Sequence, residues 1–121
     1  MDEKLEKAFG VANYMATLSN QKRVIKEEFN QKLVFYVNGG TFKVDRELIN
    51  FTKTLVDLGQ LTDVVFIDSN QLPILVSDVQ KFLDDIVAVY FEAANEYFTR
   101  INEIKSKRKL TDIVNLWLLA L

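Results

Sequence analysis

The spacing of hydrophobic residues predicts a long helix at the start of the chain. Between residues 3 and 29 apolar side chains recur at helical intervals, and only Lys22 interrupts that face. Ser19 and Asn20 favour helix caps over helix interiors, so two shorter helices are the alternative to one unbroken helix. The apolar positions are Leu5, Ala8, Val11, Ala12, Met15, Leu18, Ile25 and Phe29.

A period of two then replaces the helical spacing and predicts a β-hairpin. Asn38-Gly39 suits a two-residue type I′ turn, which needs positive φ at both central positions. This turn places Phe35 opposite Phe42, whereas a turn at Gly39-Gly40 would shift the pairing. The predicted inward set is Leu33, Phe35, Val37, Phe42 and Val44, and the outward set is Val34, Tyr36, Thr41 and Lys43.

A capped helix is predicted directly after this hairpin. Asp45 is a suitable N-cap, and Val44 with Ile49 can form a hydrophobic staple around it. Gly59 is a suitable residue to end this helix. The predicted apolar stripe of this helix is Leu48, Phe51, Leu55 and Leu58.

The residues from 63 to 76 predict a second hairpin, with strands at 64–67 and 72–76 around a turn at 68–71. Pro73 cannot donate a ladder hydrogen bond, so we expect it to face outward on an edge strand or to sit at a bulge. Ser77 is the predicted N-cap of the next helix, with Gln80 completing a capping box.

The third predicted helix runs from residue 78 to about 107 and has two adjacent apolar stripes. Two stripes indicate two packing partners. About 30 helical residues span roughly 45 Å, more than a compact domain of this length covers. We therefore expect a homo-oligomer, most simply a dimer. The first stripe is Val79, Leu83, Ile86, Tyr90, Ala93, Tyr97 and Ile104, and the second is Val87, Phe91, Ala94, Phe98 and Ile101.

A short last helix is predicted after Thr111-Asp112, with Ile113, Leu116, Trp117 and Leu119 on its apolar face. We expect this face to fold back on its own domain, with docking on a second chain as the alternative. The candidate interaction residues of the third helix and the tail are Tyr90, Tyr97, Phe98, Ile101, Leu116, Trp117 and Leu119.

Basic residues before the last helix are candidates for phosphate contacts. Lys and Arg near a helix C-terminus are also favoured by the helix dipole, and so few charges are a weak signal for nucleic acid. Nucleic-acid binding is thus the alternative function. The candidates are Arg100, Lys105, Lys107, Arg108 and Lys109.

Composition removes most catalytic chemistry. The 121 residues are 49% hydrophobic and 26% charged, with a net charge of −2 and neither Cys nor His. Thiol nucleophiles, thiolate metal sites and the commonest general base are absent, and the acidic residues of the third helix fit a solvated face. We expect no enzyme activity, no cofactor and no metal.

The N-terminus is too charged for a signal peptide, and no apolar run reaches the ~20 residues that cross a bilayer. We therefore expect a cytoplasmic protein without membrane contact. The length predicts a single α+β domain spanning residues 1–121, in which two β-hairpin–helix units form a small antiparallel sheet packed on the long flanking helices.

Three fragments resemble small uncharacterised proteins of tailed phages that infect marine cyanobacteria. They are LVFYVNGGTFKV followed by ELINF, then DVVFIDSNQLPILVSDVQKFLDDI, and YFEAANEYF. The similarity covers roughly residues 33–98 and contains no catalytic motif. It implies a phage-encoded accessory or assembly factor in the bacterial cytoplasm and assigns no functional residues. Together with the apolar stripes, it favours a non-enzymatic, oligomeric interaction protein.

Overall fold

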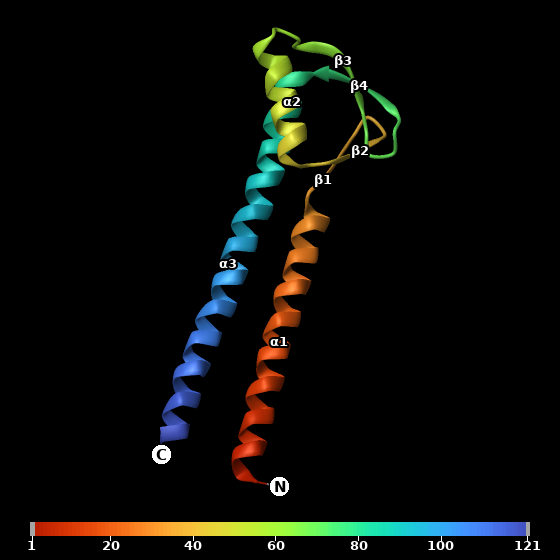
Figure 1. The fold of residues 1–121 in the computed structure, drawn as a ribbon. Helices are drawn as coiled ribbons and strands as arrows, with labels where there is room; N and C mark the ends of the chain where they lie inside the picture. Colours follow the sequence, from red (N-terminus) through yellow and green to blue (C-terminus); the bar gives the residue numbers. More distant parts are fainter. Residues whose placement is uncertain (1, 121) are drawn as a thin grey trace. The chain divides into compact units, whose positions relative to one another are not determined.

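The computed structural model describes the backbone of residues 2–120 and, within that range, all side chains except those of residues 108–113, 115–117 and 120. Helices and β-hairpins alternate along the chain, which confirms the predicted α+β class (Figure 1). The elements are α1 (Glu3–Lys32), β1 (Val34–Val37), β2 (Gly40–Lys43), α2 (Arg46–Asp57), β3 (Thr62–Ile67), β4 (Pro73–Asp78) and α3 (Val79–Ala120).

The chain forms two compact units, and α1 and α3 each contribute to both. The first, called the helix pair below, combines the residues up to Glu28 with those from Glu96 onward. The second, called the sheet unit, is Phe29–Asn95 and holds all four strands of the described chain together with α2.

Three details of the predicted architecture are wrong. The hairpins form two separate two-stranded sheets instead of one, because a loop occupies the outer edge of β2. The final residues continue α3 to Ala120 without a separate short helix. Ser77 belongs to β4, and Asp78 caps α3 instead, its Oδ1 accepting the N–H of Lys81 at 3.0 Å. The first segment forms one unbroken helix, so the alternative of two shorter helices does not apply.

The first hairpin has the predicted turn and register. Asn38 and Gly39 adopt φ of 49° and 78°, as a type I′ turn requires. Phe35 lies opposite Phe42, and Val37 opposite Gly40. Of the predicted inward set, Leu33, Phe42 and Val44 are buried, and Phe35 and Val37 are half-buried.

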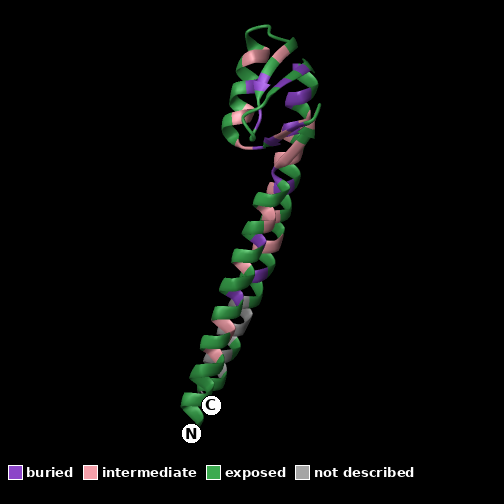
Figure 2. Cartoon of the chain, turned by 90° about the vertical axis from the view of Figure 1, so that its right-hand side faces the viewer, coloured by how far each residue is buried: buried purple, intermediate pink, exposed green. Residues whose placement is uncertain are grey.

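Phe82 of α3 is at the centre of the core of the sheet unit. Its ring centroid lies 5.2 Å from that of Phe42, 4.9 Å from that of Phe66 and 5.9 Å from that of Phe35. Both hairpins therefore pack on the same helix. Aromatic pairs in such tilted and edge contacts add about 0.5–1.5 kcal/mol each beyond the area they bury. Figure 2 shows the buried residues concentrated where the strands and helices of this unit meet.

Helix α2 has the predicted ends and a different buried face. Asp45 caps it by accepting the N–H of Leu48 at 2.8 Å, and Gly59 follows it with φ of 80°. The predicted stripe is wrong at Phe51 and Leu58, which are exposed. Thr52 is fully buried in their place, and its hydroxyl donates to the carbonyl of Leu48, so no polar group is left unsatisfied.

Asp68 connects the two hairpins. This residue is 4% exposed, and its carboxylate accepts the N–H groups of Thr41, Asn70 and Leu72 at 2.8–3.0 Å. The pKa of this carboxyl is lowered, chiefly by the hydrogen bond from Thr41 and next by the hydrogen bond from Leu72. Burial acts in the opposite direction and raises it. The loop between β3 and β4, which was predicted to be a simple turn, therefore also binds the outer edge of β2.

Candidate interaction surfaces

The helix pair has a narrow apolar contact. Leu18 and Ile25 of α1 and Ile104 of α3 are buried, and Tyr14, Tyr97 and Ile101 pack against them. Leu18 and Ile25 are seven residues apart, as are Tyr97 and Ile104, which is the spacing of a coiled-coil seam. One seam leaves the remaining faces of both helices open to solvent.

An ion pair lies at one end of this seam. The guanidinium of Arg100 binds the carboxylate of Glu28, and both side chains are more than one third exposed. A pair this accessible to water contributes about 0–1 kcal/mol. Arg100, a predicted phosphate contact, thus already has an anionic partner within its own chain.

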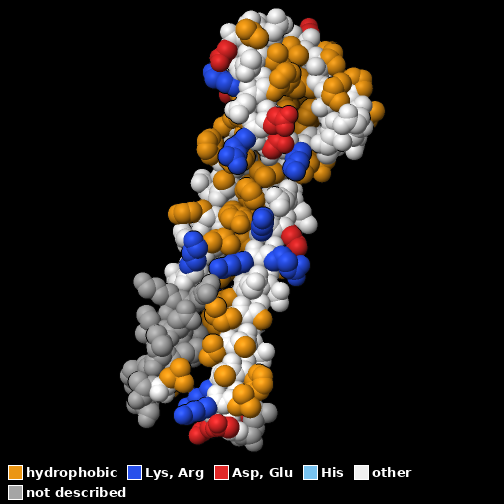
Figure 3. Space-filling view, viewed as in Figure 1, with side chains coloured by type: hydrophobic (Ala, Val, Ile, Leu, Met, Phe, Trp, Pro, Cys, Tyr) orange, Lys and Arg blue, Asp and Glu red, His pale blue; other side chains and the backbone are white. Residues whose placement is uncertain are grey.

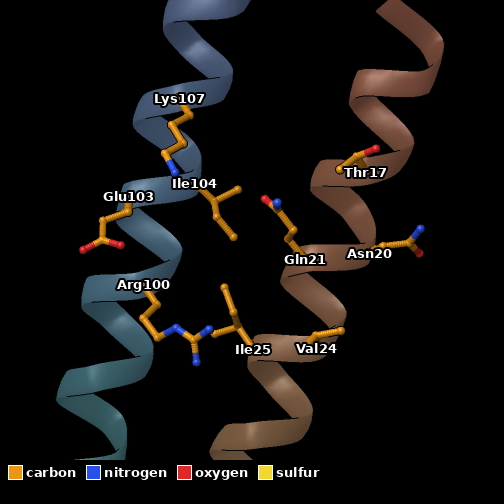
Figure 4. Close-up of a pocket in the computed structure, with 9 residues that line it drawn as sticks. All are labelled: Thr17, Asn20, Gln21, Val24, Ile25, Arg100, Glu103, Ile104 and Lys107. Carbon is orange, nitrogen blue, oxygen red and sulfur yellow. The ribbon is translucent and has the colours of Figure 1, made fainter.

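A hollow of about 430 Å³ lies beside the ion pair. In Figure 4, Gln21 and Ile25 extend from α1 toward α3, and Arg100 and Ile104 extend the opposite way. Lys107 places its ammonium group above Ile104. The lining thus combines three apolar side chains, two amides, a hydroxyl, a carboxylate and two cations, one of which pairs with Glu28. Such a surface can accept a side chain of a neighbouring helix.

Large apolar side chains are exposed on both helices of this unit. Figure 3 shows apolar side chains reaching the surface along the described part of the helix pair. Phe98 is 68% exposed, Leu119 65% and Phe9 54%. Large exposed apolar side chains indicate an interaction surface where they gather. Among the described side chains of this unit, the exposed large apolar residues are Leu5, Phe9 and Val24 on α1 with Phe98, Val114, Leu118 and Leu119 on α3.

The predicted interaction residues have different environments. Tyr90 packs on the core of the sheet unit, and Tyr97 and Ile101 pack within the helix pair. Phe98 and Leu119 are exposed, so the predicted folding back of the apolar tail on its own domain is wrong at Leu119. The side chains of Leu116 and Trp117 lie outside the described residues, as do those of Arg108 and Lys109. Lys105 and Lys107 are exposed.

Phe9 and Val24 are exposed residues that the sequence reasoning did not identify. Neither belongs to the predicted stripe of α1. Phe9 follows Leu5, a residue of that stripe, by four residues, which places the two side chains on one helical face. This spacing is the signal that would have added Phe9 to the apolar surface.

Features that often assign a function do not occur in the described part of the chain. None of its His, Cys, Asp or Glu residues gather in a group of three able to hold a metal ion. None of its helices has a stretch long and apolar enough to cross a membrane. No protein-family model, curated protein or solved structure matches the chain in the comparisons made.

Proposed function

We propose that this protein is a non-enzymatic, oligomeric interaction protein that associates through the exposed apolar residues of the helix pair. The observation that carries the proposal is the contrast between the narrow buried seam and the seven large apolar side chains that are exposed on the described part of the helix pair. Exposing them to water is unfavourable by roughly 25 cal/mol per Å² of apolar surface. A second copy that covers them removes this cost.

A two-fold dimer is the simplest assembly with this property. Two helix pairs that pack face to face form a four-helix bundle, in which each helix buries a second stripe. The hollow at Gln21 and Ile104 lies on the helix pair and can receive a side chain from the other copy. The resemblance of residues 33–98 to small phage proteins supports an accessory or assembly role in a bacterial cytoplasm.

Light scattering coupled to size exclusion tests this proposal at micromolar concentration. We expect a mass above that of the 14.0 kDa monomer for the natural sequence. The double substitution Leu5→Glu with Phe9→Glu should lower that mass, because it places charges within the proposed contact. Lys7→Glu is the matched control, since Lys7 is exposed on the side of the same helix opposite Leu5 and Phe9 and its substitution changes the net charge by the same amount. A strictly monomeric natural protein would refute the proposal.

A further inference from the structure

The outer edge of β1 has unpaired backbone groups. Thr41 and Lys43 of β2 direct N–H or C=O groups away from β1, to Asp68 and Ser69. Residues opposite each other in an antiparallel ladder point their backbone groups either toward each other or both away. The partners of Thr41 and Lys43 are Tyr36 and Val34. The N–H and C=O groups of these two residues therefore point outward from β1.

The other strand edges carry features that block further pairing. The outer edge of β2 is covered by Asp68 and Ser69. On β4, Pro73 opens the strand and the carbonyl of Leu75 accepts the amide of Asn38 at 2.9 Å. On β3, Asp63 adds a charge and a φ of 53°. Charges, proline and irregular backbone are the usual protections of an edge strand.

β1 has none of these protections. Its four residues, Val34–Val37, are apolar or aromatic and uncharged, and the side chain of Tyr36 lies on the outward face with 72% of the residue exposed. β-Branched and aromatic residues are those that favour strand pairing. Among the described residues, none forms a hydrogen bond with the outward backbone groups of Val34 or Tyr36.

The edge is also self-complementary. Val34 and Tyr36 lie symmetrically about Phe35, so a two-fold axis at Phe35 places Val34 of one copy opposite Tyr36 of the other. Both outward residues of each copy then find partners, and four hydrogen bonds form across the axis. The facing side chains make aromatic to β-branched pairs without opposing like charges.

A hollow between β1, the end of β4 and α3 provides room for a side chain of the added strand. It measures about 270 Å³ and is bordered by Phe35 and Val37 of β1 and by Phe82 of α3. Asp78, Lys81 and Asp85 also line it. A strand added to β1 directs alternate side chains to the inner side of the sheet. With the axis at Phe35, the side chain that arrives there is apolar, namely Phe35 of the second copy.

We infer that β1 pairs antiparallel with β1 of a second copy, about a two-fold axis at Phe35, and joins the two β1-β2 hairpins into one four-stranded sheet. The inference rests on the proposed oligomeric function and assigns it a second contact, on the sheet unit. A second copy fits better than an unrelated strand, because the edge satisfies all its outward groups by pairing with itself.

Two double variants test the pairing and its register. Val34→Glu with Tyr36→Glu places like charges opposite each other across the axis, and Val34→Glu with Tyr36→Lys places opposite charges there. Within one chain, Val34→Glu faces Lys43 in both variants, so the two differ chiefly across the interface. We expect the first variant to raise the dissociation constant roughly tenfold or more, and the second to restore most of the loss.

Sedimentation velocity over a dilution series provides the measurement, with circular dichroism as the check of folding. Equal dissociation constants for the natural protein and both variants would overturn the inference and leave the proposed function intact. A natural protein that is monomeric throughout would overturn both. Loss in both variants without restoration would overturn the proposed register.

Amide hydrogen exchange on the natural protein keeps the inference testable if the variants do not fold. We expect the N–H groups of Val34 and Tyr36 to be protected at high concentration and to exchange at least tenfold faster after dilution into the monomer. The N–H of Thr41 is the internal control, because it bonds within the chain to Asp68 and should stay protected. Fast exchange at Val34 and Tyr36 at all concentrations refutes the pairing.

Discussion

The backbone N–H of Thr41 lies 3.0 Å from Oδ2 of Asp68 and donates a hydrogen bond to it. This contact joins the outer edge of β2 to the loop between β3 and β4, 27 residues later in the chain. The carbonyl of Thr41 accepts the N–H of Ser69 at 2.9 Å in return. The two sheets are therefore connected at an edge without forming a common ladder, and Asp68 supplies the charge-assisted part of that connection.

Stability should fall in acid because of Asp68. Its pKa is lowered from 3.8 in the folded state. A carboxyl whose pKa is lowered by folding stabilises the fold at pH values above its pKa in the unfolded state. This stabilisation is lost as the pH falls through its pKa in the folded state. Denaturation followed by circular dichroism should give a lower midpoint near pH 2 than near pH 5. Asp68→Asn removes the titrating group, so the variant should be less stable at neutral pH and should depend less on pH in this interval. Equal pH dependence of both proteins would contradict this role.

Gly40 should tolerate no larger residue. A Cβ atom at this position would lie 2.6 Å from Cγ1 of Ile74, a side chain that is itself buried. Gly40→Ala should therefore destabilise the fold by about 1–3 kcal/mol, as overpacking of a core does. Combining it with Ile74→Val, which removes one methyl group, should recover part of this loss. Chemical denaturation gives the free energies of unfolding.

Gly10→Ala is the matched control for the substitution at Gly40. Gly10 is exposed within α1, and nothing lies within 4 Å of the added Cβ. Replacing an exposed helical glycine by alanine stabilises a helix by about 0.5–1 kcal/mol. The same chemical change should thus have opposite signs at the two glycines. A loss at Gly10 equal to that at Gly40 would show that the contact with Ile74 is not the cause.

Local sequence signals were sufficient where one short segment determines the geometry. Asn38-Gly39 specifies its turn through the positive φ of both residues, and this turn fixes the register of the hairpin. The N-cap at Asp45 is equally local. The first stripe of α3, from Val79 to Ile104, is buried or half-buried throughout, because its 3.6-residue period specifies a face whatever the partner is.

The signals failed where tertiary contacts decide between local alternatives. Ser77 and Asp78 are adjacent cap residues, and the extension of β4 selects the second. Thr52 is buried because its hydroxyl finds the carbonyl of Leu48, which hydropathy does not reveal. The cap predicted at Thr111-Asp112 is overridden by the continuation of α3. The contact between Asp68 and Thr41 spans 27 residues, so no local pattern predicts it.

Two isoleucines of α3, one in each unit, should contribute differently to the free energy of unfolding. Ile86 is fully buried in the sheet unit, and Ile86→Ala should cost about 3–4 kcal/mol through the cavity it leaves. Ile104 is 5% exposed but borders the open hollow, so Ile104→Ala should cost nearer 2 kcal/mol because solvent already reaches that site. Equilibrium unfolding in denaturant checks the order. A larger loss at Ile104 would mean that the hollow is closed in solution.

The basic residues of α3 should give no nucleic-acid binding. Each phosphate contact requires a cation free to displace counterions. Arg100 is paired with Glu28, and the chain as a whole carries a net charge of −2. Lys105 and Lys107 are the remaining candidates whose side chains are described, and two cations support little affinity. Size exclusion with mixed DNA and RNA should therefore show unchanged retention at low salt.

Lys105→Ser with Lys107→Ser is the variant that decides the interpretation of any retention shift. A shift in the natural protein that weakens with added salt and disappears in this variant would support the nucleic-acid function instead. A shift that survives the substitution would point to cations elsewhere on the surface. Arg100→Gln tests whether the ion pair with Glu28 matters for nucleic-acid binding. We expect it to change the free energy of unfolding by only about 0–1 kcal/mol and to leave the retention in the presence of nucleic acid unchanged.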